Sequence, residues 1–371
     1  MNDNNYTRIN KPNPSIMGTK NLFKAIVLFL FAGALMMTSC VKEGPMGLPG
    51  LDGKDGVDGT NGQNGVDGTA SCIACHNQTN KALISTQFDN SVHGEGPNVA
   101  YAGARSGCAT CHSGNGFVAA KTLGVRDLPA NLDKGEPFTC ATCHTSHQTF
   151  DFANDGPDYA LRLTDPLKPY MDLTGSVEID MGASNICIDC HQPRESAPIA
   201  DAEGNFYIAN NRFGPHYSTQ AVVVEGIWGY NFAQASTAIP GAGSHPHRTA
   251  ASCNSCHMHD STNGTVGGHT WNVGPSACSS CHAGINTAEA IQAAKAEYYE
   301  LFNELGEKLV EKGAMRVTAS GSLEPNPQTT VPIDVAGALF NYRLLYGDHS
   351  GGIHNPAYAK ALLKNSIEAL N

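Results

Sequence analysis

The pentapeptide Cys72-Ile-Ala-Cys75-His76 is the first of six copies of the pattern Cys-x-x-Cys-His in this chain of 371 residues. The other five are Cys108-Ala-Thr-Cys111-His112, Cys140-Ala-Thr-Cys143-His144, Cys187-Ile-Asp-Cys190-His191, Cys253-Asn-Ser-Cys256-His257 and Cys278-Ser-Ser-Cys281-His282. Together the copies contain twelve of the thirteen cysteines. One repeated pattern therefore accounts for nearly all the cysteine in the chain.

The spacing within each copy is typical of a covalent haem attachment site. Two thiols three positions apart can form thioethers to the two vinyl groups of one porphyrin, and the following histidine can bind the iron. Structural zinc sites and redox disulfides also use Cys-x-x-Cys, but neither requires a histidine after the second cysteine in all six copies. The sequence predicts six covalently bound haem c groups, with His76, His112, His144, His191, His257 and His282 as iron ligands.

The remaining cysteine, Cys40, follows an apolar run over residues 25–37 that is preceded by Lys20 and Lys24. Thirteen apolar residues are too few to span a bilayer comfortably. The run ends in Met-Thr-Ser-Cys40, which resembles a bacterial lipoprotein box. We expect residues 1–39 to be a lipoprotein signal peptide and the exported chain to be lipid-anchored through Cys40, facing the periplasm or the cell surface. The alternative is a plain cleaved signal with a spare thiol.

Glycine then recurs at every third position from Gly44 to Gly68. Nine such triplets look collagen-like. Because only Pro45 and Pro49 occupy the other positions, a triple helix this short would be weak. We expect residues 40–70 to form an extended, solvated stalk behind the anchor. A trimeric collagen stub, which would make the chain a homo-oligomer, is the alternative.

Composition and charge narrow the class of protein. Hydrophobic residues make up 41% of the chain, including its signal segment, but aromatic residues only 7%, so conventional core residues are scarce. Cofactors would have to fill much of the interior. The net charge of −11 argues against nucleic acid or an anionic membrane surface as a partner.

The pattern of residues divides the rest of the chain in two. Segments between the motifs are rich in Gly, Asn, Asp, Pro and Ser, which predicts loops and short helices with few strands. Residues 287–312 show apolar positions at helical spacing without proline, and two further helices are expected around Gly347–Asn355. We expect a hexahaem cytochrome domain over 71–285 and a helical segment over 286–371 that packs on it. The predicted fold is mostly α with extensive loops, little β and long C-terminal helices, a multihaem cytochrome c fold organised around covalently bound haems.

Nine histidines remain outside the motifs, which permits a second histidine ligand at every iron. His147 lies three residues after His144, in Cys-His-Thr-Ser-His, and is a favoured candidate. His259 follows His257 too closely to reach across to another face easily. The nine are His93, His147, His216, His245, His247, His259, His269, His349 and His354.

Several blocks near the C-terminus carry a resemblance to a known family. They are His245-Pro-His247-Arg-Thr-Ala-Ala-Ser-Cys-Asn-Ser-Cys-His-Met, Gly-Gly-His269-Thr, Cys-Ser-Ser-Cys-His before a long helix, Asn341-Tyr-Arg, and Asp348-His-Ser-Gly-Gly-Ile-His354-Asn-Pro. In this order they resemble the C-terminal half of ammonia-forming cytochrome c nitrite reductases and their multihaem relatives, over about the last 130 residues.

The resemblance implies that His269 and His354 are distal ligands and that His245 or His247 lies near the family's reactive haem. His216 in Gly-Pro-His-Tyr-Ser and His93 in Ser-Val-His-Gly are similar to distal-ligand contexts of related multihaem cytochromes. The expected distal set is His93, His147, His216, His245, His269 and His354, with His247 as the substitute for His245.

Two departures separate this chain from the nitrite reductases. The family carries a lysine in place of the proximal histidine at its reactive haem, whereas the corresponding motif here ends in His112 and no Cys-x-x-Cys-Lys is present. The family's tyrosine soon after a haem motif is also missing, because His191 is followed by Gln-Pro-Arg-Glu-Ser. Both departures argue against nitrite reduction.

The sequence favours an electron carrier, whose partners would be redox proteins or other multihaem cytochromes, and we assign no catalytic residue. One alternative is a multihaem oxidoreductase that acts on nitrite or hydroxylamine at a five-coordinate haem, with His245, His247 or Arg248 as proton donor. Another is a subunit of a surface cytochrome filament. Fold resemblance alone does not decide among them.

Overall fold

The main hydrophobic core lies in the C-terminal part of the chain. The computed structural model describes residues 72–73, 75–172, 176–260, 262 and 264–371. The expected signal peptide, Cys40 and the glycine stalk therefore lie outside the described residues. One unit of structure, Asp67–Asn371, contains both the expected haem region and the C-terminal segment.

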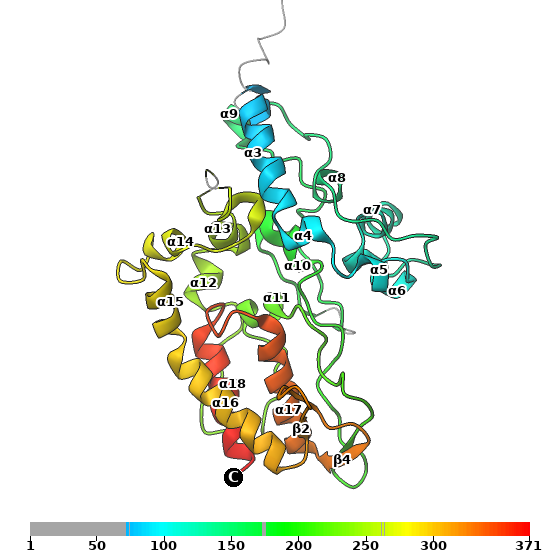
Figure 1. Ribbon diagram of the computed structural model, residues 1–371, viewed down its shortest axis with the longest axis vertical. Helices are drawn as coiled ribbons and strands as arrows, with labels where there is room; N and C mark the ends of the chain where they lie inside the picture. The colour runs from blue at the N-terminus through cyan, green and yellow to red at the C-terminus, as the bar shows by residue number, and fades with distance from the viewer. Residues whose placement is uncertain (1–71, 74, 173–175, 261, 263) are drawn as a thin grey trace, which may run out of the picture. The chain divides into compact units, whose positions relative to one another are not determined.

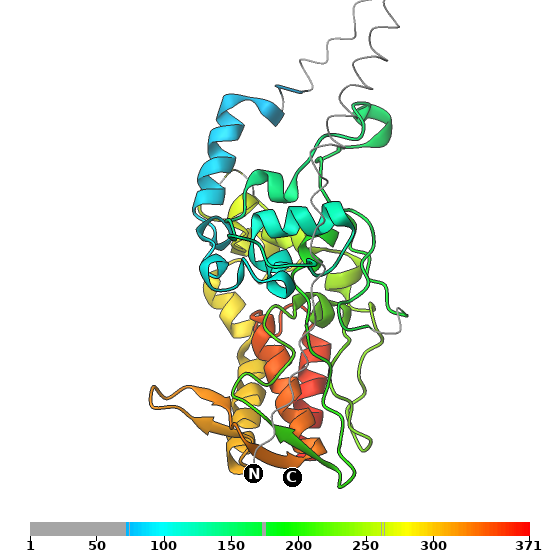
Figure 2. The same ribbon diagram turned by 90° about the vertical axis from the view of Figure 1, so that its right-hand side faces the viewer.

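Three helices, α16 (Ala296–Glu311), α17 (Ile333–Asp348) and α18 (Pro356–Ala369), pack side by side (Figures 1 and 2). α16 buries one stripe that includes Tyr298 and Leu305, as expected of an amphipathic helix. α17 is buried on most of its surface because both other helices cover it. Their buried side chains form the largest hydrophobic cluster among the described residues.

The helix that the sequence predicts over 287–312 is divided in the structure. α15 (Ala288–Ala294) begins where Thr287 accepts a hydrogen bond from the Ala290 amide at 3.2 Å, a typical N-cap. It ends at Lys295, and α16 begins at the next residue. The apolar periodicity continues through both helices, so periodicity alone did not reveal the break.

Short strands occupy the linker between α16 and α17. β2 (Met315–Val317) and β3 (Leu323–Pro325) form an antiparallel hairpin. β4 (Thr329–Pro332) pairs with β1 (Asn205–Ile208), with Phe206 opposite Val331. These two sheets of two strands are the sheets in the described part of the chain, in agreement with the expectation of little β structure.

The region before α15 is built from short helices joined by long loops. Apart from α3 (Gln78–Asp89) and α7 (Gly114–Leu123), its described helices have seven residues or fewer. They are α4 (Val92–Glu95), α5 (Val99–Ala102), α6 (Ser106–His112), α8 (Cys140–Cys143), α9 (Phe152–Asp155), η1 (Gly182–Ser184), α10 (Asn185–Ile188), α11 (Gln220–Glu225), α12 (Pro246–Thr249), α13 (Cys253–His257), η2 (Gly268–Thr270) and α14 (Pro275–Ser279).

Side-chain packing in this region is limited. The two hydrophobic clusters among its described residues are small, one around Ile179 and Ile188 and the other around Ala109 and Leu128. The cofactor-built interior that composition predicts would lie here. Among the described residues, no helix combines the length and the apolar character needed to cross a bilayer.

The loop between α17 and α18 has a constrained backbone. Gly352 has a φ of +82°, and a Cβ there would lie 2.7 Å from the Tyr298 ring, so glycine is required on both grounds. Asn355 ends the loop by accepting a hydrogen bond from the Tyr358 amide at 3.1 Å, which caps α18. The segment from Asp348 to His354 is thereby held against the C-terminal helices.

Candidate metal centres

The cysteines of most motifs lie on short helical segments. In a helical turn, side chains three residues apart share a face, so both thiols of a motif point to the same side. α6, α8 and α13 each contain both cysteines of their motif. In the fourth and sixth motifs the helix ends before the second cysteine, because α10 stops at Ile188 and α14 at Ser279.

The local sequence explains where two of these helices begin. The Thr142 hydroxyl accepts a hydrogen bond from the Thr139 amide at 2.9 Å, and the Ser255 hydroxyl accepts one from the Ser252 amide at 3.2 Å. This is one half of a capping box, formed around the first cysteine of each motif. The residues between the two cysteines therefore help to start the turn that orients the thiols.

Each motif histidine lies beside a second histidine from outside its motif. The ring centres of the six pairs are 5.9 to 6.2 Å apart. Imidazole nitrogens about 2 Å on either side of one metal ion would place the ring centres about 6 Å apart. The pairs are His76 with His147, His112 with His216, His144 with His269, His191 with His93, His257 with His354, and His282 with His247. At this spacing, the two histidines of each pair could hold one iron between them.

The sixth pair contains His247, the substitute named by the sequence analysis, and not His245. His245 is the N-cap of α12, and its Nδ1 accepts a hydrogen bond from the His247 amide at 3.2 Å. The His247 ring lies 5.9 Å from that of His282. Three described histidines fall outside the six pairs: His245, His259 and His349.

Five of the paired imidazoles have a hydrogen-bond partner at Nδ1, which leaves Nε2 available for a metal. The partners are Tyr159 O for His144 at 2.8 Å, Trp271 O for His257 at 2.8 Å, Ile353 O for His247 at 2.7 Å, Gln220 Oε1 for His191 at 3.1 Å, and Asp348 Oδ1 for His354 at 2.6 Å. In each case the partner fixes the orientation of the ring.

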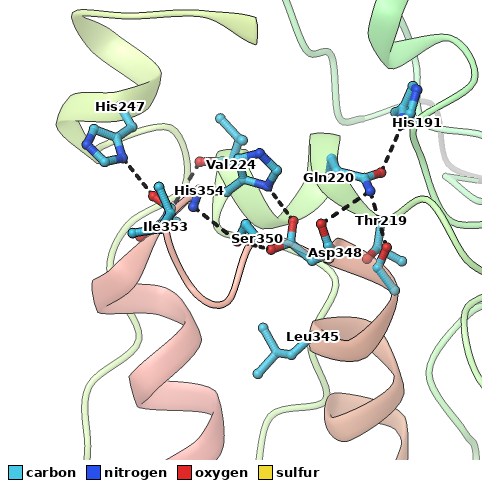
Figure 3. Close-up of polar contacts among 12 residues, drawn as sticks. His191, Thr219, Gln220, Val224, His247, Leu345, Asp348, Ser350, Ile353 and His354 are labelled. Atoms are coloured by element: carbon cyan, nitrogen blue, oxygen red, sulfur yellow. Dashed lines mark hydrogen bonds and ion pairs between the residues drawn. The ribbon is translucent and has the colours of Figure 1, made fainter. Parts of the chain in front are cut away.

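Three of these partners meet at the loop after α17, as Figure 3 shows. Gln220 on α11 faces His191, and its amide donates to Asp348 O at 3.2 Å. Asp348 faces His354, and Ile353 accepts from His247. One short loop and α11 therefore orient imidazoles of three different pairs.

Burial lowers the pKa of six of the twelve paired imidazoles and so favours their neutral form, which is the form that binds metal. Burial lowers the pKa of His93 to about 4, and the neighbouring His191 adds to the effect. Burial is also the main cause that lowers the pKa of five others, namely His112, His191, His216, His257 and His269. His354 differs, because the charge and hydrogen bond of Asp348 outweigh burial and raise its pKa.

Different motifs also lie close to one another. The Cys190 thiol donates to the backbone oxygen of Thr110, between the two cysteines of the second motif, at 3.9 Å. Cys187 lies close enough to Cys253 for each thiol to shift the pKa of the other. Cysteines of the fourth motif are therefore close in space to the second and fifth motifs, which are far from it in sequence.

Trp271 contacts one histidine from each of three pairs. Its ring centre lies 4.5 Å from that of His93 and 5.5 Å from that of His269, and its carbonyl oxygen accepts from His257. Sequence reasoning did not identify Trp271 or Gln220, because neither belongs to a motif. Asp348 stands in one of the blocks that resemble the nitrite reductases, but nothing in the pattern indicated its role.

The sequence of this chain is similar to those of known polyhaem cytochromes. No protein-family model matches the chain. It is 29% identical to the C-type polyheme cytochrome OmcC of Geobacter sulfurreducens over 288 residues, which is 64% of this chain and 37% of that protein. It is 28% identical to the C-type polyheme cytochrome OmcB of the same species over 340 residues, covering 72% of this chain and 44% of that protein.

The chain thus spans less than half the length of the relatives that it matches. Among solved structures, the crystal structure of Outer Cell Wall Cytochrome OcwA overlaps 77% of this chain and 50% of its own, at 22% identity and a TM-score of 0.46. The similarity to polyhaem cytochromes supports assignment as a multihaem c-type cytochrome with covalently bound haem c. The count of six haems and the resemblance to nitrite reductases stay predictions.

Proposed function

We propose that this chain is a hexahaem c-type cytochrome that passes single electrons between closely spaced haems. The observation that carries the proposal is the pairing of every motif histidine with a second histidine at 5.9 to 6.2 Å. Covalently bound haem c would supply the one-electron exchange. The twelve motif cysteines would attach the haems, and the proposed distal ligands are His93, His147, His216, His247, His269 and His354.

The contacts between motifs support a carrier function. The Cys190 thiol of the fourth motif donates to Thr110 O of the second at 3.9 Å, and Cys187 lies beside Cys253 of the fifth. Haems attached at these thiols would lie close together, which is the arrangement needed for electrons to pass through the protein. Two histidines at each iron would also leave no coordination position open for a substrate.

The contacts of the suggested proton donors favour the carrier over the oxidoreductase alternative. Arg248 donates to Glu225 Oε2 at 2.6 Å and to Asp180 O at 2.7 Å. His245 caps α12, and His247 faces His282. All three residues already have structural partners that account for their positions.

We propose the export and anchoring of the chain from its sequence pattern. Residues 1–39 would be removed as a lipoprotein signal, and Cys40 would carry the lipid at the base of the 40–70 stalk, facing the periplasm or the cell surface. Redox proteins or other multihaem cytochromes would be the partners. A Cys40→Ser variant should leave the membrane fraction for the soluble fraction, and unchanged membrane association would refute the anchor.

The function is tested by measuring haem content together with the spin state of the oxidised protein, by electron paramagnetic resonance and near-infrared magnetic circular dichroism. Six haems per chain, all low-spin with bis-imidazole signatures, is the expected result. One high-spin iron in six would instead support the oxidoreductase, and nitrite and hydroxylamine would then be tested as substrates. Fewer than six haems would refute the hexahaem assignment.

A further inference from the structure

The hydrogen-bond acceptors of the paired imidazoles differ in charge. Four of the five acceptors are uncharged, three of them backbone carbonyls and one the amide oxygen of Gln220. The fifth is the carboxylate of Asp348, whose Oδ1 lies 2.6 Å from His354 Nδ1. Asp158 lies near His147, but the 3.8 Å between Oδ2 and Nδ1 exceeds a hydrogen bond. Within the described residues, Asp348 is thus the one carboxylate hydrogen-bonded to a paired imidazole.

The surroundings of Asp348 strengthen this interaction. Asp348 is the last residue of α17 and is only 2% exposed. The Ser350 hydroxyl donates to its other oxygen, Oδ2, so that the carboxylate is held in place from both sides. A buried charge is screened by salt much less than a surface charge, so its effect on the imidazole persists at ordinary ionic strength.

A carboxylate at Nδ1 changes what a histidine supplies at Nε2. When Nδ1–H donates to an anion, the ring gains electron density and Nε2 becomes a more basic ligand. A more electron-donating axial ligand stabilises oxidised iron relative to reduced iron, and the reduction potential falls. The other four partnered imidazoles lack this charge, so the effect would be confined to the His257 and His354 pair.

We infer that Asp348 is a positioning residue that lowers the reduction potential of the iron site formed by His257 and His354. This inference rests on the proposed function, because it requires His354 to be an iron ligand. Gln220 supplies a natural comparison, since it makes the same kind of contact to His191 with an uncharged oxygen 3.1 Å away.

The test is spectroelectrochemical titration of the holoprotein and its Asp348→Asn variant. The asparagine oxygen can still accept from His354, but the charge is lost. The reduction potential of one of the six one-electron components should rise by about 59 mV, which corresponds to a tenfold change in its reduction equilibrium constant. All irons should stay low-spin. Unchanged potentials with six low-spin haems would overturn the inference.

Two further variants complete the experiment. Asp334→Asn removes the same charge from the exposed first turn of the same helix, and should leave the potentials unchanged. A shift as large in this control would show a general charge effect and overturn the inference. Gln220→Glu places a carboxylate beside His191 and should lower the reduction potential of a different component. This variant tests the mechanism if the Asp348→Asn protein loses haem. No lowering in that variant would count against the mechanism, whereas fewer than six low-spin haems in the unaltered protein would refute the proposed function itself.

Discussion

His144 and His147 lie three residues apart and face different partners. The His144 ring is 6.2 Å from that of His269, and the His147 ring is 5.9 Å from that of His76. The backbone leaves α8 in an extended conformation at His144, with φ −109° and ψ 150°. His144 therefore lies at the site of its own motif, whereas His147, just after that motif, lies at the site of the first motif.

A His147→Ala variant should convert one iron from low to high spin, because the iron bound by His76 would lose its second imidazole. Magnetic circular dichroism of the oxidised protein measures the number of high-spin irons. His259→Ala is the matched control, since His259 also follows a motif closely but belongs to none of the six pairs. A fully low-spin His147→Ala protein would remove this residue from the ligand set.

The roles of His245 and His247 are separable in the same way. His247→Ala should produce one high-spin iron because His282 would lose its partner, whereas His245→Ala should leave every iron low-spin and weaken only the cap of α12. Loss of an N-cap costs about 0.5–2 kcal/mol of stability. The reverse result, with high spin only in His245→Ala, would restore the preference of the sequence analysis.

The angles between paired rings predict the magnetic spectrum of the oxidised protein. Three pairs are near perpendicular, at 80° to 89°, and three lie between 40° and 53°. Perpendicular axial imidazoles make two d orbitals of low-spin ferric iron nearly equal in energy, which moves the largest g value upward. We expect two classes of low-spin signal in equal numbers. A single class holding all six irons would contradict these geometries.

Gly267 should be intolerant of a side chain. Its φ is +68°, and an added Cβ would fall on the carbonyl oxygen of His259. Since the next residue begins η2, which carries His269, Gly267→Ala should move His269 away from His144 and leave one iron high-spin. Gly264→Ala is the control, because a Cβ there meets nothing within 4 Å. Normal spin states in both variants would show that the loop adapts.

The C-terminal helices should be sensitive to lost volume. Leu363 on α18 is fully buried in the main hydrophobic cluster, so Leu363→Ala should lower the free energy of unfolding by about 2–5 kcal/mol. Val317 on β2 is 59% exposed, and Val317→Ala should change stability by less than about 0.5 kcal/mol. Urea unfolding of the holoprotein measures both. Equal effects would mean that this cluster does not limit stability.

The residues that could be predicted are those whose chemistry is local. The Cys-x-x-Cys-His motifs show their spacing within five residues, and the apolar periodicity from residue 287 predicts the start of a helix close to that of α15 at Ala288. The sequence analysis preferred His245 to His247, although both lie in the same short block, whereas the structure places His247 beside His282. This placement depends on a carbonyl of Ile353 and on a cap hydrogen bond that form only in the folded chain.

Contacts between residues distant in sequence could not be predicted either. His144 pairs with His269, and the contact of Gln220 with Asp348 joins α11 to the end of α17. No periodicity reports such contacts, since each segment is consistent with many loop arrangements. The break at Lys295 was missed for the opposite reason, because the apolar pattern on both sides of it is continuous.

The position of the main hydrophobic cluster along the sequence predicts an order of assembly for the proposed cytochrome. The cluster is built largely from helices that follow the last cysteine motif. In a chain that emerges from its N-terminus, the motifs would leave the ribosome and the export channel before those helices can pack. The thioethers would then form while the polypeptide is still unfolded, and the loop that contains Asp348 and His354 would pack against haems that are already attached. Maturation would run from covalent attachment to axial ligation, with the C-terminal helices as the last step.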